Sequence, residues 1–187
     1  QFHLLNGLVY HLQYRNGDGD KLDAAIEGYQ QAIRLDPANL AAHELVGHAY
    51  LDRRDYARAQ QAFAELAVLE ASDPSVLMRL MGASYLAGDA VTACASADEV
   101  FQMHTQLVQA EQLAFFKAAV PVYAACQQPH KAQHSLWRLR QRGVPASMVK
   151  ALDTRMEQWA MFHQSHMRKV QHTPEATAAA TDRKSVV

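Results

Sequence analysis

Small residues that recur at a fixed interval constrain this chain more than any other feature. Ala25, Ala59 and Ala93 are separated by two equal steps of 34 residues, and an aromatic residue, Tyr29 or Phe63, follows the first two by four positions. A small residue lets two helices approach closely while a ring fills the space between them. A period of this length indicates a solenoid, in which each repeat buries its apolar face against its neighbours.

Helix-spaced apolar residues, interrupted by turn residues, divide the chain into about four antiparallel helix pairs. A Gly-x-x-Tyr pair marks the first helix of three copies, beginning at Gly7, Gly47 and Gly82. The third copy is weaker because Ala97 replaces the aromatic residue, and Pro121 is expected to kink the long helix of the fourth. The expected fold class is all-α, with helices at 2–14, 21–35, 40–51, 55–69, 76–86, 90–103, 107–125 and 130–142.

A long amphipathic helix is expected at residues 146–170, where apolar side chains from Val149 to Val170 fall on one stripe. We expect it to cap the open end of the last repeat, and docking to another chain is the alternative. Residues 171–187 lack periodicity and large apolar residues, which predicts a flexible tail. The expected organisation is therefore a repeat domain at 1–145, a capping or docking helix at 146–170 and a tail.

The middle of the chain resembles the tetratricopeptide repeat. Residues 44–63 place a small residue three before a tyrosine, then an alanine nine residues on and an aromatic four further, at Gly47, Tyr50, Ala59 and Phe63. The resemblance extends over about residues 2–142. It implies a right-handed superhelix whose first helices line a concave groove that holds a peptide or helix. Members of the family are mostly adaptors, co-chaperones and assembly scaffolds without catalysis of their own.

The family register also implies which residues line the groove. Family members that clamp a carboxylate have Lys and Asn where this chain has Leu4, Leu8 and Leu45, so a carboxylate clamp is not expected. The groove is instead largely apolar, with a few polar landmarks. The implied peptide-binding residues are Leu4, Leu8, His11, Ala41, Glu44, Leu45, His48, Leu51, Asp52, Val76, Arg79, Ala83 and Leu86, and the same register adds Leu12, Leu80 and Ala87.

An exposed apolar groove usually marks an interface. We therefore expect a non-catalytic interaction module, an adaptor or assembly scaffold, that holds an apolar peptide or helix of a protein partner. Two alternatives stay open: a chaperone of a secreted or membrane-active protein, and a self-associating segment of a larger protein. A homo-oligomer would form through the last helix or the groove.

Other classes of function find little support in the sequence. It contains no phosphate-binding loop, HExxH motif or nucleophile elbow, so no enzyme is predicted. The net charge of −1 argues against a nucleic-acid partner. The Asp- and Gly-rich loop at 16–20 lacks the glycine that a calcium loop requires at its sixth position, and the histidine pairs at 130/134 and 163/166 lack a third ligand. No metal or cofactor is expected.

The sequence says less about the compartment. No apolar run approaches the roughly 20 residues that span a bilayer, so membrane insertion is not expected. Cys94 and Cys126 have no motif spacing and are expected as two buried thiols, which favours the reducing cytoplasm. The periplasm or another compartment stays open, because the chain begins at Gln1 rather than Met and a signal peptide would not be seen.

Overall fold

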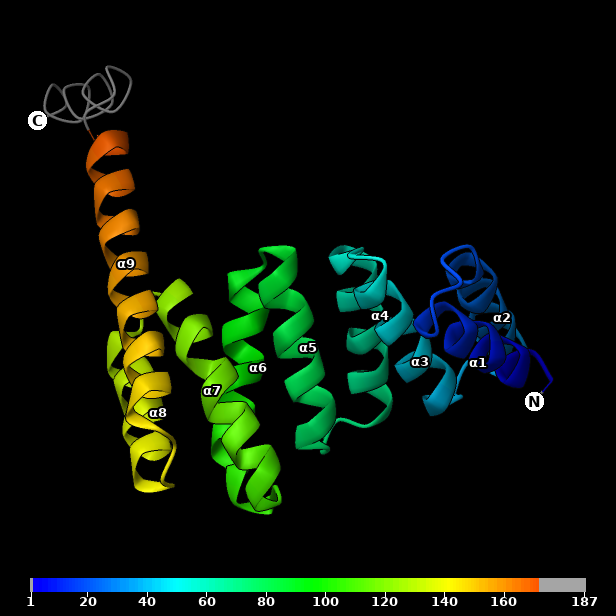
Figure 1. The fold of residues 1–187 in the computed structure, drawn as a ribbon, viewed down its shortest axis with the longest axis horizontal. Coiled ribbons are helices and arrows are strands. Elements are labelled where there is room, and N and C mark those ends of the chain that lie inside the picture. The colour runs from blue at the N-terminus through cyan, green and yellow to red at the C-terminus, as the bar shows by residue number, and fades with distance from the viewer. Residues whose placement is uncertain (1, 172–187) are drawn as a thin grey trace, which may run out of the picture. The chain divides into compact units, whose positions relative to one another are not determined.

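The computed structural model describes residues 2–171, of which 159–171 by their backbone only, and in this range the protein consists of helices and their connections (Figure 1). The expected helices are confirmed, with a short 3₁₀ segment added before the seventh. Residues 172–187 of the expected tail lie outside the described range. The elements are α1 Phe2–Arg15, α2 Lys21–Leu35, α3 Leu40–Asp52, α4 Tyr56–Leu69, α5 Pro74–Ala87, α6 Ala90–Met103, η1 His104–Gln106, α7 Gln109–Ala125, α8 Pro129–Gln141 and α9 Ala146–Gln171.

The chain divides into two compact units, residues 1–118 and 119–187, which we call unit 1 and unit 2. Helix α7 runs through this boundary, and Pro121 lies inside the helix without ending it. The expected division at residues 145 and 170 stays a prediction. Among the described residues, no helix combines the length and the apolar composition that crossing a bilayer requires.

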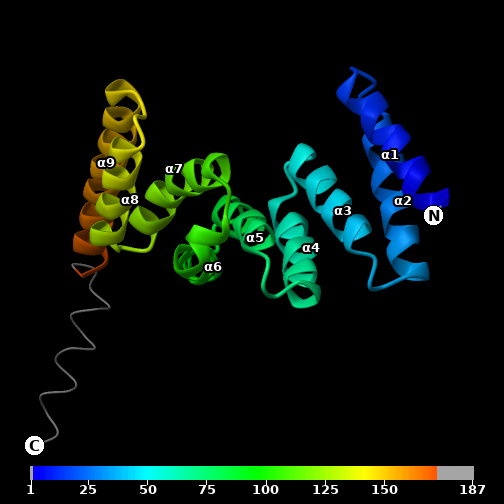
Figure 2. The same ribbon diagram turned by 90° about the horizontal axis from the view of Figure 1, so that it is seen from below.

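Unit 1 contains three helix pairs, α1 with α2, α3 with α4 and α5 with α6 (Figure 2). Helix α3 also packs on α2, and α5 packs on α4, so one core continues from pair to pair. Polar side chains set where the helices begin: an oxygen of each accepts a hydrogen bond from a backbone N–H of the first turn, which stabilises the helix start. These N-cap residues are Asn39, Asp55, Asp73 and Asp89.

Close approach within the first two pairs depends on a glycine that faces an aromatic ring. A Cβ atom on Gly7 would lie 2.7 Å from the ring of Tyr29, and one on Gly47 would lie 2.7 Å from the ring of Phe63. Both rings are completely buried. No side chain fits at either glycine without moving a ring, so the repeated glycines and aromatics of the sequence are packing residues.

At the equivalent positions of the third pair, the sizes of the two residues are reversed. Sixteen residues separate Gly47 from Phe63, and the same interval joins Met81 to Ala97, both of which are buried. Gly82, one residue further on, has open space where a Cβ would be. The expected Gly-x-x-Tyr at Gly82 is therefore a chance match, and the repeat register in α5 begins one residue earlier than predicted.

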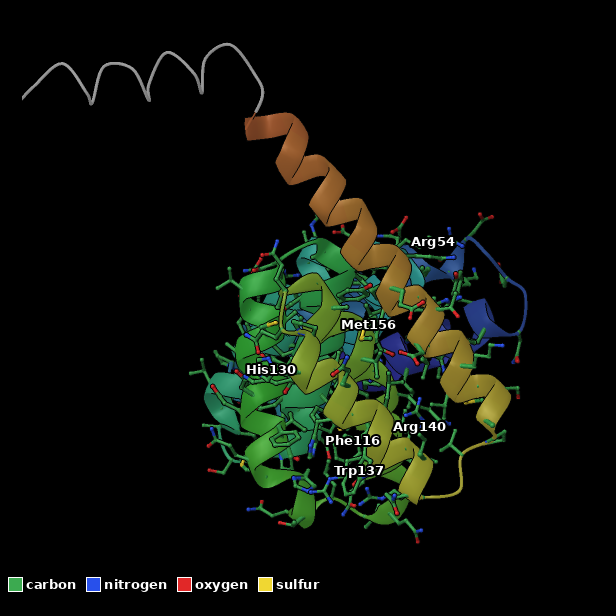
Figure 3. All side chains as sticks on the ribbon, turned by 90° about the vertical axis from the view of Figure 1, so that its left-hand side faces the viewer. Arg54, Phe116, His130, Trp137, Arg140 and Met156 are labelled. Atoms are coloured by element: carbon green, nitrogen blue, oxygen red, sulfur yellow. The ribbon has the colours of Figure 1, made fainter. Side chains whose placement is uncertain are left out.

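In unit 2, α8 lies along the first half of α9 (Figure 3). Val149 and Met156 of α9 are buried, and the guanidinium of Arg140 on α8 lies 3.5 Å from the carboxylate of Asp153. These contacts explain the apolar stripe up to Met156. The remainder of the predicted stripe, from residue 159 onward, lies outside the described side chains, and the capping role of α9 stays a prediction.

The prediction of two free thiols is wrong. Cys94 and Cys126 are both disulfide-bonded, and neither is a free cysteine. A disulfide requires Cα atoms within about 7 Å of each other, and helix packing rather than spacing along the sequence decides whether that condition is met. The argument for a reducing compartment, which rested on free thiols, falls with the prediction.

Candidate partner-binding surface

The first helices of unit 1 carry the residues that the sequence predicted for a groove. We call the exposed surface of α1, α3 and α5 that carries these residues the first-helix surface. Between α1 and α3 it contains a pocket of about 200 Å³, lined by Leu8, His11, Leu12, Arg15, Leu45 and His48. The structure therefore brings together five of the predicted residues, and it adds Arg15, which the sequence did not predict.

Apolar side chains around this pocket reach solvent. Leu8 is 36% exposed and Leu12 is 53% exposed, and Leu86 at the far end of α5 is 50% exposed. Three other predicted leucines, Leu4, Leu45 and Leu51, are half-buried because they pack against the core. Ala41 is exposed at the start of α3 and does not line the pocket.

One wall of the pocket is held by a chain of hydrogen bonds through His11. The hydroxyl of Tyr29 lies 3.2 Å from His11 Nδ1, and burial raises the pKa of this phenol to about 12, which keeps it a donor. On the other side of the ring, Nε2 lies 2.9 Å from a carboxylate oxygen of Asp52. A neutral imidazole with its proton on Nε2 satisfies both contacts, accepting from Tyr29 and donating to Asp52.

His11 was predicted to meet a partner, but its ring is buried and both its nitrogens are engaged. Its contacts join α1 to α2 and to α3. Since a buried network of this kind fixes the elements that carry it, His11 is a positioning residue for the pocket and not a group that a partner can bind through hydrogen bonds.

The charge of Asp52 is balanced within the same cluster. Arg15 Nε donates to the carboxylate at 3.2 Å. Burial on its own would raise the pKa of Asp52, but the hydrogen bonds from His11 and Arg15 and the positive charge of Arg15 outweigh it and hold that pKa below its usual value. Asp52 is therefore a carboxylate at neutral pH, and its charge is met by a cation.

A second balanced cluster joins α3 to α5. The Arg79 guanidinium lies 2.8 Å from the carboxylate of Glu44, and His48 lies 3.9 Å from the same oxygen. The His48 ring packs edge-on against Phe63, with centroids 5.4 Å apart. Burial, and then the charge of Arg79, lower the pKa of His48 against the opposing effect of Glu44, so its imidazole is neutral at physiological pH.

The register shift in α5 corrects the third copy of the predicted set. Val76 and Ala83 are 2% and 1% exposed, and Leu80 is also buried, so these residues belong to the core and offer no surface to a partner. Applying the 34-residue step to α3 finds the residues that share the first-helix surface: Ser75, Met78, Arg79, Gly82, Tyr85 and Leu86. All six are at least partly exposed.

Sequence reasoning also missed a second pocket, of about 500 Å³, on α2, α3 and α4. It is more polar than the first, and Gln30 donates to the hydroxyl of Tyr50 at 2.7 Å beside it. Its lining residues are Gln30, Ile33, Arg34, Val46, Tyr50, Arg58, Gln61, Ala62 and Glu65. Within the described part of the chain, no three His, Cys, Asp or Glu side chains are grouped so as to hold a metal ion.

Comparison with known proteins identifies the repeat. The family model described as "TPR repeat" matches residues 18–52, which include α2 and α3. Fifteen chains of solved structures are similar, among them the one named "MamA MSR-1 C2", which aligns over 76% of this chain and 72% of its own with 17% identity and a TM-score of 0.52. A search of curated proteins finds no match. Residues 18–52 thus match the tetratricopeptide repeat, and the stacked helix pairs of the chain form an all-α solenoid, a fold that it shares with this solved structure.

Proposed function

We propose that the first-helix surface of unit 1 holds an apolar segment of a protein partner, and that the chain acts as an adaptor or assembly scaffold without catalysis. The observation that carries this proposal is the pocket of about 200 Å³ between α1 and α3, bordered by the exposed side chains of Leu8 and Leu12. A recess with exposed leucines at its edge suits one apolar anchor residue of a partner.

The charges of the surface support an apolar partner over an acidic one. Arg15 is engaged by Asp52, and Arg79 is engaged by Glu44, so each cation already has an anion beside it. An acidic peptide would have to displace these carboxylates before it could form ion pairs of its own. An apolar side chain gains about 25 cal/mol for each Å² of apolar surface it buries, without that competition.

His48 supplies a polar group at the wall of the pocket. Its neutral imidazole has a donor and an acceptor nitrogen, and only the longer 3.9 Å contact with Glu44 involves its Nε2. We expect it to hydrogen-bond a backbone group of the bound segment, which would fix the segment's direction while the apolar anchor supplies most of the binding free energy.

A peptide-display selection against the full chain tests the proposal. Enriched peptides should carry an apolar anchor and little net charge. Replacing both Leu8 and Leu12 by Glu should weaken the best peptide by about a hundredfold, since two exposed leucines each contribute on the order of 1.5 kcal/mol when fully buried. Leu45 is left unchanged because it packs on the core, and its substitution would disturb folding.

The matched control is Val68→Glu, at a side chain that is 81% exposed on α4. This variant should bind as well as the parent, and circular dichroism should show that both variants are folded. Full binding by the folded double variant, or enrichment of acidic peptides, would show that the surface is not an apolar groove. The chaperone alternative would use the same surface.

A further inference from the structure

The pocket of about 500 Å³ has no part in the function proposed above. Its lining residues come from α2, α3 and α4, and each of these helices packs on both the helix before it and the helix after it. The pocket therefore lies between the first two helix pairs and does not involve the first or the last helix of the chain. Its volume falls in the range of about 300–1,000 Å³ that small-molecule sites usually have.

A buried hydroxyl donor is open at this pocket. Tyr50 is 6% exposed, and its oxygen accepts a hydrogen bond from the side-chain amide of Gln30 at 2.7 Å. A phenol has one O–H donor besides its acceptor lone pairs, so this bond leaves the proton of Tyr50 unused. Among the described residues, no acceptor for that proton lies within hydrogen-bond distance. A buried donor without an acceptor is costly, and a ligand in the pocket can supply the acceptor.

Two arginines line the same pocket from different helices, Arg34 on α2 and Arg58 on α4. Arg34 Nε donates to the side-chain oxygen of Gln31 at 3.2 Å, and no carboxylate of the described residues lies within ion-pair distance of its guanidinium. Arg58 Nε lies 3.6 Å from the carboxylate of Asp55, and its guanidinium lies over the Tyr50 ring, 5.9 Å from the centroid. Arg34 is therefore the cation that is open to an anionic ligand, and Arg58 adds positive charge beside it.

The pocket also offers apolar contact. Val46 is 3% exposed, Ala62 is 5% exposed and Ile33 is half-buried, so the apolar lining residues lie within the recess. One carboxylate, that of Glu65, lines the pocket as well. Glu65 would repel a ligand with two negative charges more strongly than a ligand with one, and a single charge is enough to balance Arg34.

We propose that this pocket binds a small carboxylic acid with an apolar body. The carboxylate pairs with the guanidinium of Arg34 and accepts the O–H of Tyr50, while the apolar body lies against Val46 and Ala62. A guanidinium binds a carboxylate through two parallel hydrogen bonds, which fixes the orientation of the acid. A small molecule suits the pocket because the apolar contact is available to a ligand that enters the recess whole.

The proposal is independent of the function proposed for the first-helix surface. With about 100° between successive residues of a helix, Val46 and Tyr50 lie on the side of α3 opposite to Leu45 and His48. The acid and the partner segment would therefore bind to different faces of unit 1. The double leucine variant described above should bind the acid as well as the parent does, so failure of one proposal is distinguishable from failure of the other.

Titration of the full chain with 3-phenylpropionate, followed by ¹H–¹⁵N NMR, tests the proposal. The acid should shift the Nε–H signal of Arg34 and bind with a dissociation constant on the order of 1 mM, as expected for a ligand of about ten heavy atoms. The neutral amide of the same acid has nearly the same shape and should bind at least about tenfold more weakly. Equal binding of acid and amide, or no binding of the acid, would overturn the proposal.

Substitution of Arg34 tests the position of the acid. Arg34 is exposed, so Arg34→Gln should leave the fold intact, and the acid should bind at least about tenfold more weakly without its cation. Arg34→Lys keeps the charge and should restore part of the affinity. The matched control is Arg155→Gln, at an exposed arginine of α9 that does not line the pocket, and it should bind the acid as the parent does. Unchanged binding by Arg34→Gln, or an equal loss in the control, would overturn the proposal.

Substitution of Tyr50 tests the buried donor. Tyr50→Phe removes the hydroxyl but keeps the ring beneath Arg58, so it should weaken binding of the acid by about fivefold while circular dichroism stays unchanged. Full affinity in this variant would contradict the proposed arrangement.

A peptide of the same chemistry tests the size of the ligand. Acetylated Ala-Ala-Phe carries the same carboxylate and ring on a longer chain, and it should bind no more tightly than the free acid. Tighter binding of the peptide would assign the pocket to a protein partner and overturn the proposal of a small acid.

Discussion

The second and third helix pairs of unit 1 differ in which helix carries the large residue and which carries the small one at equivalent positions. In the second pair Gly47 on α3 makes room for Phe63 on α4. In the third, a large side chain stands on the first helix and a small one on the second, as Met81 and Ala97. The comparison teaches that the repeat preserves the combined volume at this contact and not the residue type at either position, as expected for an interior packed at high density.

The exchange also explains why the sequence misplaced the residues of α5 that reach the first-helix surface. Because Met81 occupies the place of Gly47, the residues before and after it shift by one relative to the predicted register. Val76 and Ala83 lie in the core, as do their counterparts Ala42 and Ala49 on α3, and Tyr85 is partly exposed. A single exchange of sizes was thus enough to make the prediction wrong for a whole helix.

The largest expected effect concerns the third pair. Met81→Ala should lower the free energy of unfolding by about 2–5 kcal/mol, because a buried side chain is removed and a cavity is left. Adding Ala97→Phe should restore part of this loss if the two positions share one space, as Gly47 and Phe63 do. Urea unfolding of the parent, both single variants and the double variant gives the coupling free energy directly.

Ala97→Phe alone should be destabilising, since the added ring meets Met81. If the effects of the two substitutions on the free energy of unfolding were additive, the two positions would not share one space, and the idea of a size exchange would be wrong. Phe63→Leu, combined with Met81→Ala, serves as a control, because it changes a ring that belongs to the preceding pair.

A smaller effect distinguishes the two glycines that look alike in sequence. Gly47→Ala should destabilise the fold by about 1–3 kcal/mol, since the new Cβ would lie 2.7 Å from the Phe63 ring. Gly82→Ala should instead stabilise it by about 0.5–1 kcal/mol, because alanine favours the helix and the space around this position is open. Thermal unfolding of the two variants measures the difference in stability. If both substitutions changed the stability equally, Gly82 would occupy the same position in the repeat as Gly47.

The smallest effect concerns the first two pairs, which the His11 cluster joins. Asp52 has a lowered pKa in the folded state, so it contributes stability at pH values above its ordinary unfolded pKa of about 3.9. This contribution is lost as the pH falls through the lowered folded-state pKa. Asp52→Asn should therefore cost most at neutral pH and progressively less in acid. Denaturant unfolding at several pH values measures this difference, and a pH-independent cost would show that the charge of Asp52 does not stabilise the fold.

The sequence predicted the fold more completely than the surface. The alanine period is set by helix packing, which repeats along the chain, so Ala25, Ala59 and Ala93 were sufficient to place the helix pairs. Gly82 misled the register because a glycine next to the required position carries the same local signal. The alanine period and the Gly-x-x-Tyr pair disagreed by one residue, and the period was the better guide.

Properties that depend on contacts between helices were beyond the sequence. His11 looked like a groove residue, but its burial follows from Tyr29 and Asp52 on two other helices. The state of Cys94 likewise depends on packing. Arg15 was missed because its role is defined by Asp52, 37 residues away. The spacing of residues along one helix indicates which of them share a face of that helix. It does not indicate which residues of other helices pack against that face.

The paired charges of the first-helix surface have a consequence for kinetics. With Arg15 beside Asp52 and Arg79 beside Glu44, the surface projects little net field into solvent. Without such a field, association proceeds at the unsteered rate of about 10⁵–10⁶ M⁻¹s⁻¹, and salt changes it little. Under the proposed function, the rate at which a partner binds would depend mainly on its local concentration, and the lifetime of the complex would depend on how well one apolar residue fits the pocket between α1 and α3.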